Sequence, residues 1–108
     1  MTTPTTPPTF ICGTVNADGS TVSNWGTFDV IKGSVGLWTI IFLPAFDTPP
    51  AVTAIQVFGG LDNTTGSDGD NSVVTYVDAT RFQLLTGTNG GQRDWRGFSF
   101  IAAGSAGS

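Results

Sequence analysis

The sequence predicts an all-β fold, an antiparallel β-sandwich of six to seven short strands. Segments rich in Val, Ile, Thr and Phe, which favour strands, follow one another along the chain, and many of the 15 glycines separate them. No window shows the apolar spacing i, i+3, i+4, i+7 that marks an amphipathic helix. Turn signals at intervals of about 8 to 12 residues are typical of a sandwich or a small jelly roll.

The first strand is expected over residues 10–15. The turn that follows it contains Gly19, which can adopt a positive φ, and Asp18, whose carboxylate can accept a hydrogen bond from nearby backbone. Both properties are typical of a tight turn between antiparallel strands.

The clearest hairpin joins residues 21–32 to residues 37–43 through the glycine-containing turn 33–36. Gly26 interrupts the first of these strands and predicts a β-bulge. Pro44 ends the second strand because proline has no N–H for the ladder.

Four more strands are predicted after this hairpin. A strand over 51–58 carries apolar side chains on both faces, and a final strand covers 95–103. Between them, strands 72–77 and 81–86 pair across the short turn 78–80. Polar, glycine-rich segments, 59–71 and 87–92, provide the two long connections.

The 108 residues are enough for one domain only. Residues 1–9 are expected to form a Thr/Pro-rich arm or linker, because this composition favours extended backbone. The β-sandwich domain then covers 10–104, and 105–108 form a flexible tail. No signal peptide or transmembrane helix is predicted.

Composition argues against several classes of function. The chain has no histidine, which is the usual general base and the commonest metal ligand, so we expect neither an enzyme nor a cofactor. A net charge of −4 and a pI near 4.1 argue against nucleic acid and anionic membranes as partners. The single cysteine, Cys12, cannot form an intrachain disulfide and is expected to be a buried thiol.

Only 11% of the residues are charged, about half the usual share in a soluble domain. This sparse charge, together with the two apolar faces of strand 51–58, predicts a homo-oligomer, with a trimer as the expected state. The alternative is an ordinary monomeric sandwich whose strands alternate imperfectly.

Three segments carry a resemblance to known sandwich domains. In the first, an apolar strand is followed by Phe46 and then by Pro49 and Pro50 before the next strand. The others are the turn and inward Phe of 77–83 and the closing strand 98–104. The pattern resembles H-type lectins, such as snail agglutinins and discoidin C-terminal domains, and also the trimeric tips of phage tail fibres.

The resemblance implies a parallel trimer that binds carbohydrate in shallow sites near the protomer boundaries. In H-type lectins an Arg on the strand corresponding to 72–77 holds the sugar, and this chain has no Arg there. A preference for N-acetylgalactosamine therefore does not carry over. The loop before the last strand does supply the polar and aromatic groups of the second part of the family's site.

The candidate ligand-binding residues follow from this chemistry, since a sugar needs an aromatic face and planar polar groups. The predicted site consists of Asn89, Gln92, Arg93, Asp94 and Trp95, together with Asp62 and Asn63 from the neighbouring acidic loop. The alternative interpretation is that Arg93 and Asp94 form a surface ion pair and Trp95 caps the core.

The acidic loop 61–71 also contains Asp68 and Asp70, and oxygen ligands at this density could hold Ca²⁺. Its spacing is not that of an EF-hand, so we expect a solvated loop and no metal. Trp25 and Trp38 are expected to be packing residues.

Two functions are consistent with these observations. The first is a non-enzymatic, carbohydrate-binding or receptor-binding head that becomes multivalent through oligomerisation. The alternative is a structural protein, such as a virion decoration or fibre subunit, whose N-terminal arm contacts a neighbour. Either function predicts an extracellular or virion-surface location.

Overall fold

The computed structural model describes residues 8–57, 71–88 and 90–105. It contains eight strands: β1 (Thr9–Val15), β2 (Thr21–Trp25), β3 (Thr27–Lys32), β4 (Leu37–Leu43), β5 (Ala51–Val57), β6 (Asn71–Val77), β7 (Arg81–Gly87) and β8 (Gly97–Gly104). No helix lies within these three ranges, and so none is long and apolar enough to span a membrane. Of the predicted arm, only its last two residues fall within the described part of the chain, and Thr9 already belongs to β1.

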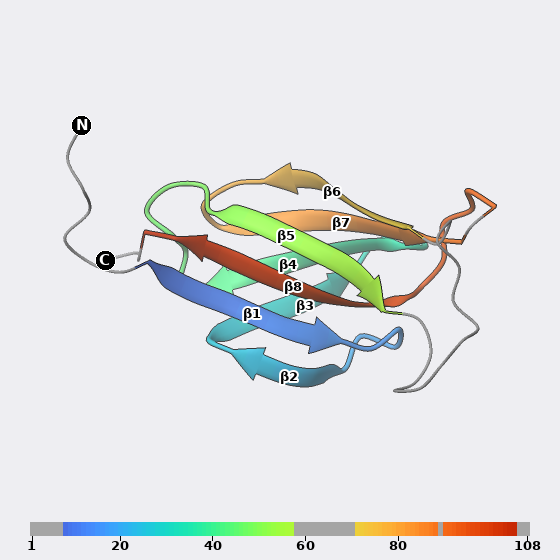
Figure 1. The fold of residues 1–108 in the computed structure, drawn as a ribbon, viewed down its shortest axis with the longest axis horizontal. Coiled ribbons are helices and arrows are strands. Elements are labelled where there is room, and N and C mark those ends of the chain that lie inside the picture. The colour runs from blue at the N-terminus through green and yellow to red at the C-terminus, as the bar shows by residue number, and fades with distance from the viewer. Residues whose placement is uncertain (1–7, 58–70, 89, 106–108) are drawn as a thin grey trace.

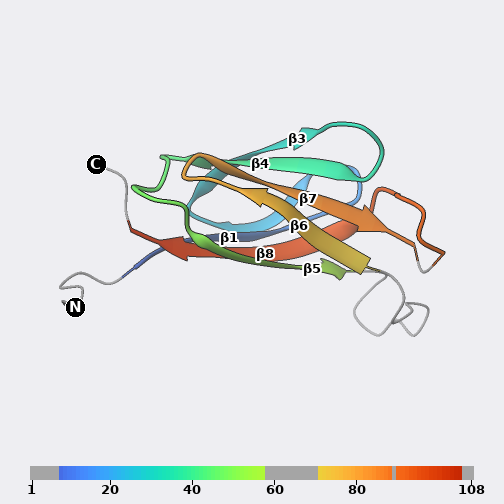
Figure 2. The same cartoon turned by 90° about the horizontal axis from the view of Figure 1, so that it is seen from above.

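The strands form two four-stranded antiparallel sheets that pack face to face (Figures 1 and 2). The first sheet has the order β2-β1-β8-β5 and the second has the order β3-β4-β7-β6. The predicted all-β sandwich is confirmed, with eight strands instead of six to seven.

The additional strand arises at Gly26, where the predicted β-bulge is wrong. Residues 21–32 do not form one strand: β2 pairs with β1 in the first sheet, and β3 pairs with β4 in the second. Gly26 has a φ of 79°, and a Cβ there would lie 3.2 Å from Cγ1 of Ile11. The glycine therefore lets the chain cross from one sheet to the other where a side chain would be crowded.

The turns follow the predicted chemistry. Gly19 has a φ of 94°, and the carboxylate of Asp18 accepts a hydrogen bond of 2.9 Å from the backbone N–H of Ser20. At the β6–β7 turn, Asp78 accepts one of 2.7 Å from the N–H of Thr80. The β3–β4 and β6–β7 hairpins are both confirmed.

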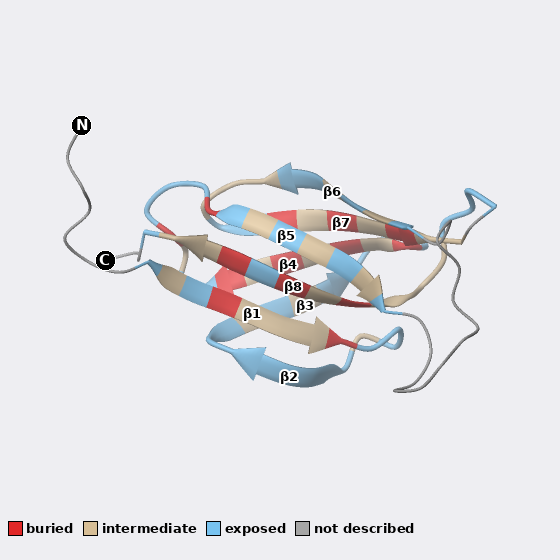
Figure 3. Ribbon diagram, in the orientation of Figure 1, coloured by how far each residue is buried: buried red, intermediate tan, exposed pale blue. Residues whose placement is uncertain are grey.

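Aromatic residues make up more than half of the buried core between the sheets. The buried positions are red in Figure 3. Its largest side chains are fully buried and lie on β4, β7 and β8: Trp38, Phe42, Phe82 and Phe98. Trp38 meets Phe98 edge to face, with ring centroids 5.1 Å apart. The prediction that Trp38 packs is confirmed, whereas the same prediction for Trp25 is wrong, because that side chain is 73% exposed at the end of edge strand β2.

The two flanks of the sandwich are closed differently. On one flank the backbone itself crosses between the sheets at Gly26. On the other, β5 lies beside β6, and the hydroxyl of Ser72 joins them. It accepts a hydrogen bond of 3.1 Å from the backbone N–H of Gln56 and donates one of 3.4 Å to the carbonyl of Ala54.

Candidate functional site

The candidate site lies at the end of the sandwich where β7 connects to β8. The connection folds back on itself, because the N–H of Thr88 donates to the carbonyl of Gln92 at 2.8 Å and the N–H of Gly91 donates to the carbonyl of Thr88 at 3.0 Å. Gly91 adopts a φ of 81°, which favours glycine in this turn. The segment is therefore an ordered part of the fold wherever the structure describes it.

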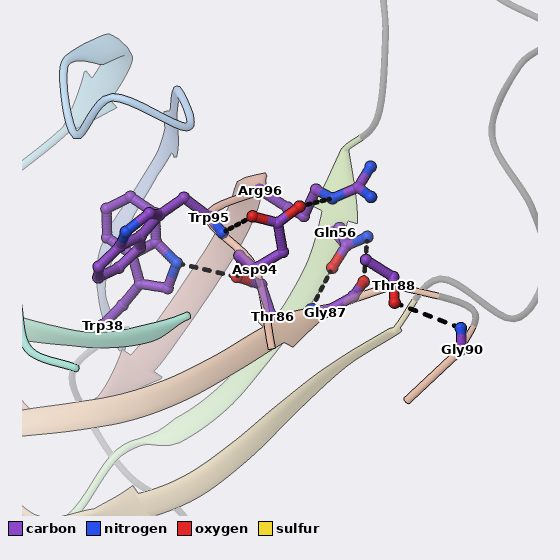
Figure 4. Close-up of polar contacts among 9 residues, drawn as sticks. All are labelled: Trp38, Gln56, Thr86, Gly87, Thr88, Gly90, Asp94, Trp95 and Arg96. Atoms are coloured by element: carbon purple, nitrogen blue, oxygen red, sulfur yellow. Dashed lines mark hydrogen bonds and ion pairs between the residues drawn. The ribbon is translucent and has the colours of Figure 1, made fainter. Parts of the chain in front are cut away.

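A side-chain amide from the first sheet holds the start of this connection (Figure 4). The amide nitrogen of Gln56 on β5 donates to the carbonyl of Gly87 at 3.0 Å, and its amide oxygen accepts from the N–H of Gly87 at 3.1 Å. This paired contact satisfies both backbone groups of Gly87 and joins the two sheets beside the site.

A buried hydroxyl holds the other end of the connection. Thr86 is 1% exposed, and its Oγ1 accepts a hydrogen bond of 3.1 Å from Nε1 of Trp38. The same hydroxyl donates a bond of 2.7 Å to the carbonyl oxygen of Asp94. Figure 4 shows this chain of contacts from the core tryptophan to the backbone of the site.

Asp94 has both carboxylate oxygens engaged. Oδ1 accepts a hydrogen bond of 2.9 Å from the N–H of Trp95, and Oδ2 lies 3.4 Å from Nε of Arg96. Among the described side chains the ion-pair partner of Asp94 is thus Arg96, not Arg93 as the alternative interpretation expected. The Arg96 side chain is 15% exposed and that of Asp94 is 51% exposed, so the pair lies half in the protein and half in solvent.

This pair borders a surface depression of about 500 Å³. Residues 14–17, from β1 and the turn after it, form one wall, Val57 at the end of β5 forms a second, and residues 94–97 form a third. Besides the compensated ion pair, the polar residues of the lining are Asn16, whose amide nitrogen donates to Ser20 at 3.0 Å, and Thr14, whose hydroxyl is hydrogen-bonded to that of Ser99 at 2.8 Å. Such a lining suits a small, polar, uncharged molecule better than an ion.

Two other predicted residues, Gln92 and Arg93, line a separate depression of about 200 Å³ beside Asn71 and Val73 of β6. The structure therefore divides the predicted run 92–95 between two neighbouring hollows. Asn89, Asp62 and Asn63, which complete the predicted site, lie outside the described residues.

Trp95 is half-buried and packs against the core. Its ring meets Trp38 edge to face at a centroid distance of 4.8 Å, and Nζ of Lys32 lies 4.6 Å from its centroid. A cation above an aromatic ring is a favourable contact, and it occupies a face that a sugar would use. This geometry matches the capping alternative and leaves only part of the Trp95 ring available to a ligand.

Several residues that shape the site have no recognisable signal in the sequence. Lys32, Gln56 and Thr86 come from β3, β5 and β7, and only the fold brings them to the connection before β8. The pairing of Asp94 with Arg96 in preference to Arg93 also depends on backbone direction, because both arginines are close to Asp94 in sequence.

No group of three or more His, Cys, Asp or Glu side chains with metal-binding geometry occurs among the described residues. Asp62, Asp68 and Asp70 of the acidic loop lie outside those residues. The expectation that the protein needs no metal therefore stays a prediction.

No protein-family model, curated protein or solved structure matches this chain. The resemblance to H-type lectins and tail-fibre tips thus rests on the sequence pattern alone.

Proposed function

We propose that this protein is a non-enzymatic binding domain that holds uncharged carbohydrate, free or on a glycosylated receptor, in the depression beside Asp94 and Arg96. The observation that carries the proposal is the lining of that depression, where four polar residues border a space of about 500 Å³ next to Trp95: Asp94, Arg96, Asn16 and Thr14. Paired polar groups of this kind can bind adjacent sugar hydroxyls.

The ligand is expected to be neutral because the charges in the lining compensate each other. An anionic ligand would compete with Asp94 for Arg96, and a cationic ligand would compete with Arg96 for Asp94. A sugar hydroxyl can instead donate to the half-exposed carboxylate without breaking the ion pair.

A shallow site on a domain of this size binds a single sugar weakly, with Kd on the order of 1 mM. We therefore propose that a homo-oligomer, with a trimer as the expected state, supplies useful affinity through multivalency. Several sites on one assembly raise avidity by a factor of about 100 or more when the glycans are suitably spaced. An extracellular or virion-surface location fits this role.

The test is binding to an array of multivalent glycans with two matched aspartate variants. Asp94→Asn keeps an acceptor for the Trp95 N–H but removes the charge, and we expect about a tenfold loss of binding. Asp29→Asn removes the same charge from an exposed position on β3, and it should bind as the parent does.

Arg93→Ala reports on the second depression, and it should also bind normally if the Asp94 depression is the site. Equal binding by the parent, Asp94→Asn and Asp29→Asn would contradict the proposed site. A blank array would contradict carbohydrate binding altogether.

The second candidate function is a structural subunit, such as a decoration or fibre protein of a virion. The observation that favours it is the outward face of the first sheet, where large apolar side chains are exposed, Trp25 and Ile55 among them. A blank glycan array combined with stable self-assembly would support this candidate. Deletion of residues 2–8 tests its arm, because an arm that contacts a neighbour should be needed for assembly.

A further inference from the structure

The outward face of the first sheet differs in charge from the rest of the protein. None of its four strands, β1, β2, β5 and β8, contains an Asp, Glu, Lys or Arg residue. Large apolar side chains are exposed on these strands instead, each by 43% or more: Phe10, Val22, Trp25, Ile55, Val57 and Ile101.

The strand register makes most of these side chains one continuous surface. Cys12 is paired with Trp25 on one side and with Ile101 on the other, and Ile101 is paired in turn with Thr53. The next outward row contains Ser99 and Ile55. Paired residues on antiparallel strands point to the same side, so the rows form one face, which is turned towards the viewer in Figure 3.

The outward face of the second sheet has a different character. Asp29 and Arg81 are both paired with Ile41 of β4, which places one charge of each sign in a single outward row. Gln83 and the exposed Tyr76 add polar groups on β7 and β6. Charge and polarity therefore distinguish the two faces, although both belong to four-stranded sheets.

We propose that the outward face of the first sheet is the surface through which copies of this chain associate. The chain carries a net charge of −4, so two copies repel each other wherever their acidic surfaces meet. This face is free of that repulsion, because none of its strands carries a charged side chain. A basic or acidic partner would find no charge here to recognise, whereas a second copy offers the same neutral surface.

The size of the face is sufficient for a specific but weak contact. Four strands at a spacing of about 4.8 Å and about seven residues long cover roughly 19 by 23 Å. Two such faces would remove on the order of 1,000 Å² from water, which is the lower bound for specific interfaces. We therefore expect assembly with a dissociation constant in the micromolar range.

This inference specifies the contact surface of the oligomer in the proposed function, and its test needs no glycan. Mass is measured by sedimentation across about 1 to 500 µM, where the parent should reach a multiple of 11.2 kDa. Ile55→Lys places a charge on the face and should stay at 11.2 kDa throughout.

Ile31→Lys is the matched control. Ile31 is also exposed and also lies on an edge strand, but it belongs to the second sheet, so this variant should assemble as the parent does. The melting temperatures of both variants show whether they fold. If Ile55→Lys fails to fold, Ile101→Lys is the alternative single variant that places a charge on the same face.

Cys12 gives an independent readout, because it lies in the middle of the face and is half-buried in the isolated chain. Its reaction with a thiol reagent should be about tenfold slower in the assembled parent than in Ile55→Lys. A parent of 11.2 kDa at every concentration would overturn the proposal, whether or not it binds glycans. Dissociation by Ile31→Lys while Ile55→Lys stays assembled would overturn it too.

Discussion

Gly36 lies so close to Thr86 that a Cβ on the glycine would be 2.7 Å from the carbonyl oxygen of the threonine. The two residues are also joined by a hydrogen bond of 2.9 Å from the N–H of Thr86 to the carbonyl of Gly36. The β3–β4 turn is thereby packed directly against the end of β7 that holds the candidate site.

Gly36→Ala should therefore destabilise the protein by about 3 kcal/mol or more. The change adds overpacking, worth about 1–3 kcal/mol, to the cost of a left-handed backbone at φ 78°. Gly91→Ala is the control, because Gly91 has a similar φ of 81° but no atom within 4 Å of the added Cβ. Urea unfolding should show a loss of only about 1–2 kcal/mol for that control. Equal losses would show that the contact with Thr86 is unimportant.

Thr86→Val should cost about 2–3 kcal/mol, because it leaves the buried Nε1 of Trp38 and the carbonyl of Asp94 without the hydroxyl that joins them. Thr39→Val is the comparison, since Thr39 is half-buried on β4 and only accepts a longer bond of 3.3 Å from Gln83. We expect that change to stay within about 0.5 kcal/mol. The measurement is denaturant unfolding, and similar losses for both variants would contradict the role given to Thr86.

Tyr76 should titrate above its ordinary range. Its hydroxyl donates a hydrogen bond of 2.7 Å to Oδ2 of Asp78, and that bond, followed by the negative charge of Asp78, raises the pKa of the phenol. Tyr76 is the only tyrosine, so alkaline titration followed by ultraviolet absorbance reports on it alone. Asp78→Asn should lower its pKa, whereas Asp18→Asn, at the opposite end of the sandwich, should leave it unchanged. An identical titration in the parent and Asp78→Asn would refute this account.

Asp78 should also contribute to the pH dependence of stability. The hydroxyl of Thr80, then that of Tyr76, then backbone N–H groups of the turn donate to its carboxylate and lower its pKa well below the usual value. A depressed folded-state pKa gives stability that is present above the unfolded pKa of about 4 and is lost as pH falls towards the folded value.

Melting temperatures at about pH 7 and pH 2 test this expectation. Asp78→Asn should be less stable than the parent at the higher pH, and the difference should shrink at the lower one. Thr80→Ala, which removes one donor to the carboxylate, should act in the same direction with a smaller effect. A constant difference between parent and Asp78→Asn at both pH values would rule out this contribution.

Alternating side chains and turn residues predicted most of the strands, because both signals are local. The assignment of strands to sheets is not local, and this is why residues 21–32 were expected to form a single strand. Positive φ at a glycine is compatible with a bulge and with a crossing alike. Only the pairing of β2 with β1 and of β3 with β4 distinguishes them.

Local sequence signals are also insufficient to predict the contacts within the candidate site. The run 92–95 was found from its residue types, but the sequence does not show that Lys32 covers Trp95 or that Asp94 turns towards Arg96. The exposure of Trp25 was also missed, because an edge strand and a central strand can have the same local composition.

The unequal flanks of the sandwich have a consequence for how it opens. At Gly26 the sheets are joined by covalent backbone, so that flank can act only as a hinge. Among the described residues the opposite flank is held by side-chain hydrogen bonds alone, those of the Ser72 hydroxyl with β5 and those of the Gln56 amide with Gly87, so local opening of the fold should start there. Hydrogen–deuterium exchange should then be fastest at the β5–β6 flank and slowest in β4 and β8. Because the side-chain amide of Gln56 on β5 is hydrogen-bonded to the backbone of Gly87, opening of this flank would also change the geometry of the candidate site.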